Sequence, residues 1–251
     1  MDREKEPLVI FGINSVQEKL KSAPQEVFEL MIVKSHGHLT LSSIDEEARR
    51  MGLRVRYVDS KVLNLLAEGQ RHQGIAARVA PYPYRAFDDL LQELSSPSAQ
   101  ERVLILDGFT DPRNFGAVLR CAESAGVRHV VIPKDRSVAV TPTVVKSSAG
   151  AVHYLKIYRV PNLTRMLQAL KERGFWIIGL DGGATHGVYD RAYPERVAVV
   201  LGSEGSGIRP LIRQECDFLV SIPMLGKVAS LNVAVAGGIF LYELVRQSKP
   251  L

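Results

Sequence analysis

Cysteine is scarce in this chain of 251 residues, which contains only two. Cys121 and Cys216 lie far apart, each inside a helix-like stretch. Two thiols cannot build a framework of disulfides, and neither has neighbours at the spacing of a metal site. Reduced thiols in a cytosolic protein are the simplest interpretation, and we expect no metal.

Long hydrophobic runs are also missing. Residues 1–7 are mostly charged and lack the apolar core of a signal peptide. The most apolar late stretch, residues 228–242, is interrupted by Ser230 and Asn232. It is also shorter than the ~20 residues that a membrane span needs. We therefore expect a cytoplasmic protein, away from membranes, with a buried C-terminal helix.

Charge of one sign is only slightly in excess, with 32 Lys and Arg against 27 Asp and Glu. The net charge of +5 and the isoelectric point of about 9.2 lean toward an acidic partner such as nucleic acid. Many soluble enzymes share such a balance, so charge alone does not decide the partner.

The short apolar runs that are present alternate with helix-like stretches, which indicates an α/β fold. In the first part we expect strands at 8–11, 30–33, 55–58 and 75–79, a helix over 44–51, and a helix capped by Asn14 that runs through Leu20. Pro81 and Pro83 then break the pattern, because proline fixes its own φ angle, lacks a backbone N–H, and restricts the backbone conformation of the residue before it. We predict a domain over residues 1–79 and a linker over 80–99, in which 88–94 form a helical turn and 95–98 a polar turn.

Residues 100–251 are predicted to form a second, larger domain. Continuous apolar runs at 103–106, 130–132, 176–178 and 197–200 suit strands of a parallel sheet covered on both faces. Helices are expected at about 114–125, 163–173 and 231–246. Ligands of such open sheets bind at the carboxyl edge of the strands, so the segments that follow these strands are the candidates for chemistry.

The first such segment spans residues 107–120. Asn114 is placed to cap a helix, and Arg120 falls off the apolar stripe of that helix, next to small residues that leave room for a ligand. The stripe itself has helical spacing and consists of Phe115, Val118, Leu119 and Ala122. Taken alone, the segment is better explained as an ordinary capped helix with a surface arginine.

The second segment, residues 201–207, contains three glycines, which permit unusual backbone angles and close approach of a ligand. The spacing of the dinucleotide fingerprint is not met, and no Gly-Lys-Ser/Thr follows, so a P-loop is excluded. Glu204 is unexpected in a nucleotide-binding turn, because its carboxylate would repel a phosphate. A roomy turn between a strand and a helix is the alternative.

The third segment spans residues 222–233, where a strand ends and a helix opens with Ser230 or Asn232 as its cap. Backbone amides at such a helix start could hold a carboxylate, for example that of a methionine moiety. Taken alone, the segment is better explained as a capped terminal helix without a ligand.

The three segments together resemble the signature motifs of the TrmH-type SPOUT methyltransferases. Asn-x-Gly-Ala-x-x-x-Arg, Leu-Gly-Ser-Glu-Gly-x-Gly and Ile-Pro-Met…Ser-Leu-Asn-Val-Ala occur here in the order of that family, within residues 103–246. Residues 11–16 and 72–77 resemble the start and end of the RNA-binding domain of the RlmB subgroup. In that subgroup the domain is similar to a ribosomal protein of L30 type, and the substrate is a guanosine of 23S rRNA.

The resemblance implies an RNA 2′-O-ribose methyltransferase that uses S-adenosylmethionine. It also implies a SPOUT domain with a parallel sheet and a C-terminal trefoil knot, a small N-terminal α/β RNA-binding domain, and a homodimer formed through the catalytic domain. The catalytic residues would be Arg120, Asn114 and Glu204. Cofactor contacts would come from Leu180, Asp181, Gly182, Gly202, Ile222, Met224, Ser230, Leu231 and Asn232. RNA contacts would come from Asn14, His72, Gln73 and Arg113.

In this family the arginine is often proposed to act as the general base, which conflicts with the chemistry of a guanidinium group. A guanidinium stays protonated and has no acceptor lone pair. We therefore expect Arg120 to bind the phosphate beside the target ribose through paired hydrogen bonds and to stabilise developing negative charge. Asn114 would orient the ribose, and Glu204 would pair with Arg120 or bind substrate.

Three alternatives stay open at this stage. The chain could be an RNA-binding protein of ribosome assembly that has lost the chemistry, or a methyltransferase that acts on tRNA. The bare alternation of strands and helices also fits a dinucleotide-dependent oxidoreductase, although the fingerprint of that class is missing.

Overall fold

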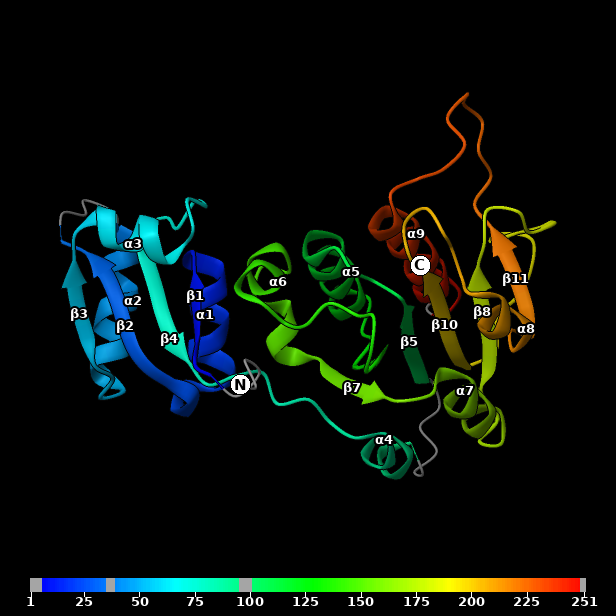
Figure 1. Ribbon diagram of the computed structural model, residues 1–251, viewed down its shortest axis with the longest axis horizontal. Coiled ribbons are helices and arrows are strands. Elements are labelled where there is room, and N and C mark those ends of the chain that lie inside the picture. The colour runs from blue at the N-terminus through cyan, green and yellow to red at the C-terminus, as the bar shows by residue number, and fades with distance from the viewer. Residues whose placement is uncertain (1–5, 35–38, 95–100, 249–251) are drawn as a thin grey trace. The chain divides into compact units, whose positions relative to one another are not determined.

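The computed structural model describes residues 6–34, 39–94 and 101–248, and the chain forms two compact units (Figure 1). The first comprises Met1–Pro83 together with Val140–Tyr154, and the second comprises Tyr84–Ala139 and Leu155–Leu251. The predicted turn at 95–98 and most of the charged N-terminal segment lie outside the described residues. Among the helices of the described ranges, none is both long and apolar enough to cross a membrane.

The first unit contains a four-stranded mixed sheet in the order β1-β4-β2-β3. Strand β4 runs antiparallel to β1 and β2, whereas β3 runs parallel to β2. All four predicted strands are confirmed, as β1 (Leu8–Phe11), β2 (Val27–Val33), β3 (Val55–Val58) and β4 (Ile75–Val79). The helical elements of this unit are α1 (Ile13–Ser22), the 3-10 turn η2 (Pro24–Glu26), α2 (Leu39–Arg50), α3 (Ser60–Leu66), α6 (Pro142–Ser147) and the 3-10 turn η3 (Ala151–Tyr154).

Helix α1 begins differently from the prediction that Asn14 caps it. The residue before the helix is Gly12, whose φ of 93° is available to glycine and strained for other residues. Because glycine has no side chain, the N-cap residue cannot itself accept a hydrogen bond from the first turn of the helix. Instead Gln73, far away in sequence, accepts from the backbone N–H of Ile13 at 3.2 Å. The prediction was wrong because the cap comes from another segment of the unit.

The second unit contains a seven-stranded sheet in the order β7-β6-β5-β10-β8-β11-β9, in which every pairing is parallel. Its strands are β5 (Glu101–Asp107), β6 (His129–Pro133), β7 (Lys156–Val160), β8 (Trp176–Leu180), β9 (His186–Gly187), β10 (Arg196–Gly202) and β11 (Phe218–Ser221). Its helices are α4 (Phe87–Glu93), α5 (Pro112–Ser124), α7 (Leu163–Lys171), α8 (Pro210–Gln214) and α9 (Val233–Ser248). The four continuous apolar runs are strands, as predicted, whereas β7 and the short β9 were not expected.

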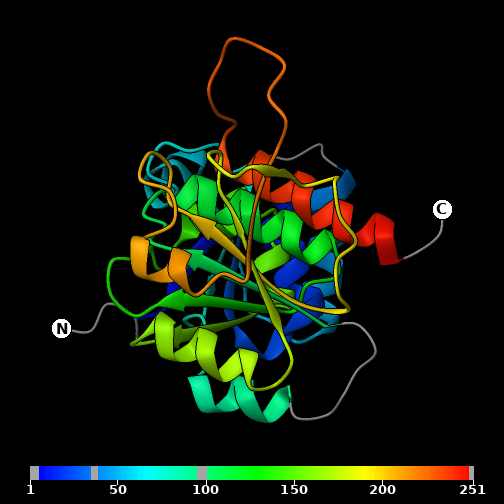
Figure 2. The ribbon, with the colours of Figure 1, turned by 90° about the vertical axis from the view of Figure 1, so that its right-hand side faces the viewer.

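Helices cover both faces of this sheet. Figure 2 shows α5 and α9 on one face, and α4 and α7 on the other. On the second face, Leu90 of α4 and Leu170 of α7 belong to one buried cluster with Ile105 and Val200 of the central strands. Burial on both faces explains why these strands read as unbroken apolar runs rather than as an alternating pattern.

The order of the strands places a switch point between β5 and β10. The chain proceeds from β5 to β6 and β7 on one side, and then crosses to β8 and β10 on the other. At the carboxyl end, Gly202 of β10 is paired in register with Asp107 of β5. Open parallel sheets bind ligands at such a point, and the segments predicted to carry chemistry follow these two strands.

The segment from Tyr84 to Leu94, in the predicted linker, is attached to the second unit. The backbone N–H of Arg85 donates to Ile157 of the edge strand β7 at 3.0 Å, and Arg159 donates to the carbonyl of Arg85 at 3.1 Å. Leu90 and Leu94 are buried in the core. The predicted helical turn at 88–94 is therefore present as α4, and it covers the sheet next to β7.

Candidate active site

The first candidate segment forms the start of helix α5. Asp111 caps this helix, because its carboxylate accepts from the backbone N–H groups of Arg113 at 3.2 Å and Asn114 at 3.1 Å. Pro112 takes the first helical position, which suits its fixed φ and missing N–H. The prediction that Asn114 caps the helix was wrong, and the side chain of Asn114 is left available for another contact.

The apolar stripe of α5 is buried as predicted, with Phe115, Val118, Leu119 and Ala122 all fully inaccessible. Arg120 lies outside this stripe and is exposed. It makes no hydrogen bond or ion pair with the residues that the structure describes. Arg113 stands seven positions earlier, on the same face of the helix, so two free cationic groups share that face.

The second candidate segment is a tight hairpin at the end of β10. Ser203 and Gly207 exchange backbone hydrogen bonds of 3.2 and 3.0 Å, which close the turn around Glu204. Gly207 has a φ of 66°, in the region that favours glycine. A Cβ on Gly202 would lie 2.1 Å from the carbonyl carbon of Gly207. The hairpin itself therefore accounts for Gly202 and Gly207, and it carries Glu204 within its turn.

The far end of this hairpin is fixed to β5. Asp107, which is 1% exposed, accepts from the backbone N–H of Arg209 at 2.9 Å and from its Nε at 2.7 Å. The same guanidinium also makes an ion pair with Asp107 through Nη2. A buried carboxylate is tolerated only when its oxygens are paired in this way. The hairpin is thus held at both ends, by its own bridge and by the end of the neighbouring strand.

Side chains from the three candidate segments are joined by hydrogen bonds. Asn114 donates from Nδ2 to the carboxylate of Glu204 at 2.6 Å, and Asn232 donates from Nδ2 to Oδ1 of Asn114 at 2.9 Å. The Oδ1 of Asn232 accepts from the backbone N–H of Ala234 at 2.9 Å, at the start of α9. Asn232 rather than Ser230 therefore caps this helix. We call the three side chains, Asn232, Asn114 and Glu204, the amide relay.

The orientation of every group in the amide relay follows from one backbone donor. An N–H can only donate, so the N–H of Ala234 requires the oxygen of Asn232 to face it. The nitrogen of Asn232 then faces the oxygen of Asn114, and the nitrogen of Asn114 faces Glu204. Glu204 must accept, which its carboxylate does. No Glu204–Arg120 contact occurs in the described structure, so the acidic residue pairs with Asn114 instead.

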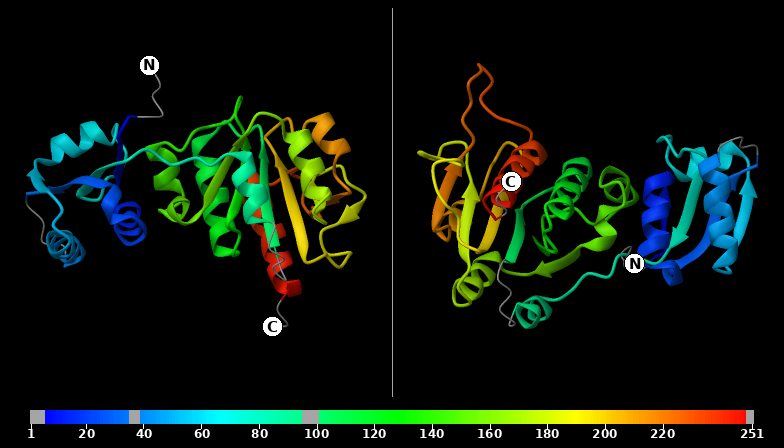
Figure 3. Two further views of the ribbon diagram at one scale, coloured as in Figure 1. Left: turned by 90° about the horizontal axis from the view of Figure 1, so that it is seen from below. Right: turned by 180° about the vertical axis from the view of Figure 1, so that it is seen from behind.

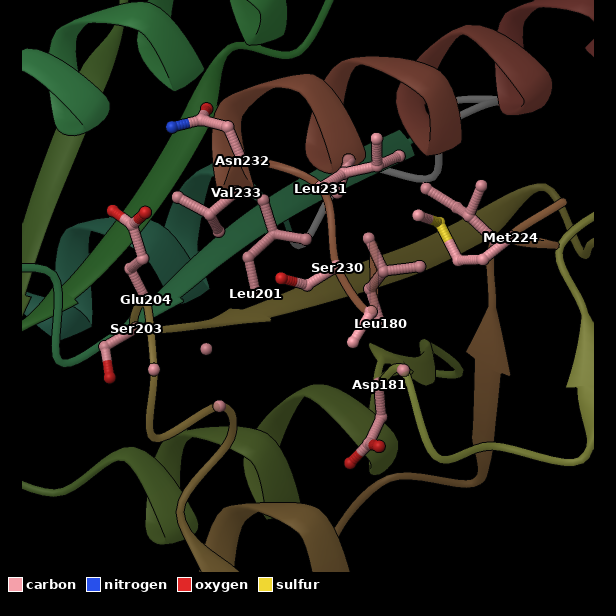
Figure 4. Close-up of a pocket in the computed structure, with 17 residues that line it drawn as sticks. Leu180, Asp181, Leu201, Ser203, Glu204, Met224, Ser230, Leu231, Asn232 and Val233 are labelled. Carbon is pink, nitrogen blue, oxygen red and sulfur yellow. The ribbon is translucent and has the colours of Figure 1, made fainter. Parts of the chain in front are cut away.

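A cavity of about 530 Å³ lies at the carboxyl ends of β8, β10 and β11, beside the amide relay. All nine residues expected to contact a cofactor line it, namely Leu180, Asp181, Gly182, Gly202, Ile222, Met224, Ser230, Leu231 and Asn232. Figure 4 shows Glu204 and Asn232 at one side of the cavity and Met224 at the other. The size and the mixture of apolar walls with a few polar groups are typical of small-molecule sites.

Two features of the lining bear on what could bind there. The carboxylate of Asp181 accepts from the N–H of Gly183 at 2.8 Å and forms an ion pair with Arg213 at 3.3 Å, so it is partly occupied. A Cβ added to Gly182 would meet no protein atom within 4 Å, and its backbone angle does not require glycine. A side chain at position 182 would conflict with nothing in the described chain, which leaves close approach of a ligand as a reason for the glycine.

The loop before α9 supplies much of this lining. Residues 222–232 extend away from the sheet of the second unit (Figure 3), and Leu225 near its tip is 99% exposed. Met224 and Leu231 are also exposed large apolar side chains, at 39% and 38%. The apolar wall of the cavity is therefore open to solvent, as a site that must admit a ligand requires.

The predicted RNA contacts in the first unit have structural partners. His72 accepts at Nδ1 from the N–H of Gly74 at 3.0 Å, and its Nε2 lies 3.1 Å from Oδ1 of Asn64. Burial, with the nearby Lys146, lowers the pKa of His72, so the imidazole is neutral. Gln73, besides capping α1, accepts from Lys146 at 3.2 Å. Asn14 is exposed.

Neither thiol is suited to nucleophilic chemistry. Burial raises the pKa of Cys121, and it raises the pKa of Cys216 to about 12. A nucleophilic cysteine needs the opposite shift, because the thiolate is the reactive form. Within the residues that the structure describes, no group of three or more His, Cys, Asp or Glu side chains could hold a metal ion.

Sequence reasoning missed three residues that organise this site: Asp107, Asp111 and Arg209. Asp111 could have been found, because an Asp followed by Pro is a strong signal for a helix start. The ion pair between Asp107 and Arg209 joins residues 102 positions apart and leaves no local signal.

Comparison with known proteins agrees with the geometry. The family of SpoU rRNA methylases matches residues 101–242, and a domain described as RNA 2′-O ribose methyltransferase substrate binding matches residues 9–85. The chain is 43% identical to the 23S rRNA (guanosine-2′-O-)-methyltransferase RlmB of Vibrio vulnificus, over 95% of this chain and 96% of that protein. It is 42% identical to RlmB of Escherichia coli, over 95% of this chain and 98% of that protein.

A solved structure supports the same fold. The SpoU methyltransferase AviRb from Streptomyces viridochromogenes, in complex with the cofactor AdoMet, is similar with a TM-score of 0.78. The match covers 96% of this chain and 90% of that one, at 22% identity. At this identity the likeness concerns the fold alone, and it extends over nearly the whole of this chain.

Proposed function

Since the chain belongs to the SpoU rRNA methylase family, we propose that it transfers a methyl group from S-adenosylmethionine to the ribose 2′-hydroxyl of a guanosine in 23S rRNA. The observation that carries this proposal is the amide relay, which joins the three motif segments at the rim of a cavity of suitable size. A protein that had lost the chemistry would have no reason to keep this arrangement together with the free Arg120.

The cavity residues fit the cofactor. Leu180, Ile222, Met224 and Leu231 supply apolar surface for a purine ring, and Ser230 supplies a hydroxyl beside it. When bound, S-adenosylmethionine supplies an electrophilic methyl group on a sulfonium. The chain must then hold a ribose in line with that methyl group, and fixing two reactants in this way supplies much of the rate.

Asn114 and Arg120 act on the RNA. Asn114 has its amide orientation fixed by the relay, so it presents the same polar edge to every ribose that binds. Arg120 has its guanidinium free for a bidentate contact with the phosphate next to the target. It stabilises negative charge that develops on the 2′-oxygen, and phosphate or water takes the proton. Glu204 acts through Asn114 and is a positioning residue.

The first unit delivers the substrate. We assign residues 1–79 to an RNA-binding domain similar to ribosomal proteins of L30 type and residues 100–251 to the methyltransferase domain, of which Val140–Tyr154 packs in the first unit. Of the linker predicted over residues 80–99, the part from Tyr84 to Leu94 packs on the second unit. Asn14, His72, Gln73 and Arg113 contact RNA in this proposal. A ribosomal substrate is favoured over tRNA because the relatives of 42–43% identity that match 95% of the chain, including its N-terminal unit, are named as 23S rRNA methyltransferases.

Two further properties of the SPOUT class belong to this proposal. The C-terminal segment threads through a loop to form a trefoil knot, and two copies of the chain associate through the methyltransferase domain. Both properties affect the cofactor site, since the loop at 222–232 and helix α9 form one of its walls. Ribosomal RNA as substrate also places the protein in the cytoplasm.

The test is methyl transfer from tritiated S-adenosylmethionine to unmodified 23S rRNA, followed by nuclease digestion to identify the labelled nucleotide. We expect label in 2′-O-methylguanosine, and loss of that label in Arg120→Ala with cofactor affinity unchanged. Arg120→Lys at nearly full activity would contradict the bidentate role, because an ammonium cannot reproduce the fork. If only tRNA is labelled, the substrate is tRNA and not 23S rRNA. If the protein does not bind S-adenosylmethionine, the proposal that it is a methyltransferase is refuted.

A further inference from the structure

A second cavity, of about 780 Å³, opens at the same carboxyl edge of the larger sheet. It is lined by residues that follow β6 and β7 and by the start of α8, whereas the first cavity lies at β8, β10 and β11. The two cavities share no residue, yet the hairpin at 203–207 lines the first and Arg209, just beyond it, lines the second. No role of the second cavity is contained in the methyl-transfer reaction.

Arg209 enters this cavity in a fixed position. Its Nε and Nη2 are both held by the buried Asp107, and its side chain is nevertheless 46% exposed. The remaining nitrogen, Nη1, has no hydrogen-bond partner among the described residues. A guanidinium immobilised in this way loses little conformational entropy when a ligand binds, which favours affinity.

Arg136 is the second guanidinium of the cavity, and it has no ion pair or hydrogen bond with the described chain. Its φ of 58° is left-handed, a conformation that is strained for a residue other than glycine. Backbone strain of this kind is concentrated at functional sites. Asp135, next to it, also lines the cavity.

We propose that this cavity holds a nucleotide of the substrate RNA that adjoins the methylated one, with Arg136 and Arg209 bound to its phosphate. This inference rests on the proposed function. The guanidinium of Arg136 presents a fork of donors that matches the geometry of phosphate oxygens, and Arg209 adds its remaining nitrogen, Nη1. Asp135 is an acceptor for N–H groups of a base. The carboxylate of Asp135 disfavours a free inorganic anion, so the mixed charge favours a nucleotide. The strand would pass over the hairpin that carries Glu204.

The test compares Arg136→Ala with Arg165→Ala in the full-length protein. Arg165 is exposed on α7 beside the cavity but does not line it, which makes it the matched control. Binding of unmodified 23S rRNA is measured by filter retention over a range of salt concentrations, and S-adenosylmethionine affinity by calorimetry without RNA. Arg136→Ala should bind RNA about tenfold more weakly, with a salt slope shallower by roughly one phosphate contact. Its cofactor affinity should be unchanged, and Arg165→Ala should resemble the wild type.

Two results would overturn the inference. If Arg136→Ala binds RNA as tightly as the wild type, Arg136 does not contact a phosphate. If Arg165→Ala loses as much RNA affinity as Arg136→Ala, the loss reflects only the lower positive charge of the protein and not a contact in the cavity. Failure of the proposed function is separate, because it appears as wild-type protein that binds RNA but transfers no methyl group. The comparison of RNA affinities still decides the inference in that case.

Discussion

The amide relay makes a prediction that uses an isosteric substitution. Asn232→Asp keeps an oxygen that accepts from the N–H of Ala234, so the cap of α9 is retained. The second oxygen of the introduced carboxylate then replaces a donor and faces Asn114. To satisfy it, Asn114 must turn its amide around, and its own oxygen then faces the carboxylate of Glu204 at a position where the present contact is 2.6 Å.

The magnitude follows from the contacts that are lost. The substitution converts one donor–acceptor contact into a repulsive pair of oxygens in either orientation of the Asn114 amide. The pair lies between positions 232 and 114 in the present orientation, and between Asn114 and Glu204 in the reversed one. A mispaired polar group costs about 1–3 kcal/mol when it is buried, and these side chains are exposed or half-exposed. We therefore expect the free energy of unfolding to fall by about 1–2 kcal/mol, and methyl transfer to slow because Asn114 no longer presents the same edge to the ribose. The cap of α9 remains in this variant, so the loss of stability comes from the relay alone.

The assay is urea unfolding, together with methyl transfer from S-adenosylmethionine to unmodified 23S rRNA, for Asn232→Asp, Glu204→Gln and the double variant. In the double variant the new amide at position 204 donates to the turned oxygen of Asn114, so the relay runs in the reverse direction and stability returns. A purely additive loss in the double variant would refute the reasoning. Asn232→Ala serves as the control that loses the cap, and it should lower stability by about 1 kcal/mol.

Three other changes test separate parts of the structure. Gly202→Ala forces a Cβ against the backbone of Gly207, so it should destabilise the protein by about 2 kcal/mol in urea unfolding and abolish cofactor binding. Asp111→Ala removes the cap of α5 and should cost about 1 kcal/mol, whereas Asp111→Asn should keep most of that stability. Burial lowers the pKa of His153 from its ordinary 6.5 to about 3. The unfolded chain therefore binds a proton that the folded one excludes, and stability falls as the pH drops below 6.5. Between pH 6.5 and 4.5, His153→Gln should lose about 2 kcal/mol less than the wild type in unfolding free energy, and equal losses would contradict this pKa.

The strands could be predicted where burial on two faces leaves an unbroken apolar run, as in β5 and β10. Strand β7 could not, because it lies at the edge of the sheet and Lys156 and Arg159 interrupt its apolar residues. Five residues with neither an unbroken apolar run nor a strict alternation cannot be distinguished from a loop. The starts of the helices were predicted close to their observed positions, but the cap residue was wrong in α1 and α5. In α1 the cap comes from a distant side chain, Gln73, and in α5 two good capping residues, Asp111 and Asn114, stand close together in the sequence.

The cavity residues came from the resemblance of the motifs, and their clustering agrees with it. The amide relay could not have been predicted, because it joins side chains 90 and 118 positions apart in the sequence. The expectation that Glu204 pairs with Arg120 or binds substrate belonged to the mechanism implied by the resemblance, and no spacing supported it. The hairpin instead directs Glu204 to Asn114, and this direction is set by backbone hydrogen bonds between Ser203 and Gly207 that no residue type reveals.

The segment Val140–Tyr154 leaves the second unit and packs in the first. Val144 and Val152 are buried there, and Lys146 donates to the carbonyl of Arg71 at 2.9 Å. The chain thus changes units after Pro83, after Ala139 and again after Tyr154. A fragment that begins at Tyr84 would expose this segment to water, so the two units cannot be separated by one cut. A ligand that stabilises the first unit therefore also stabilises Val140–Tyr154, a segment that lies by sequence within the methylase region.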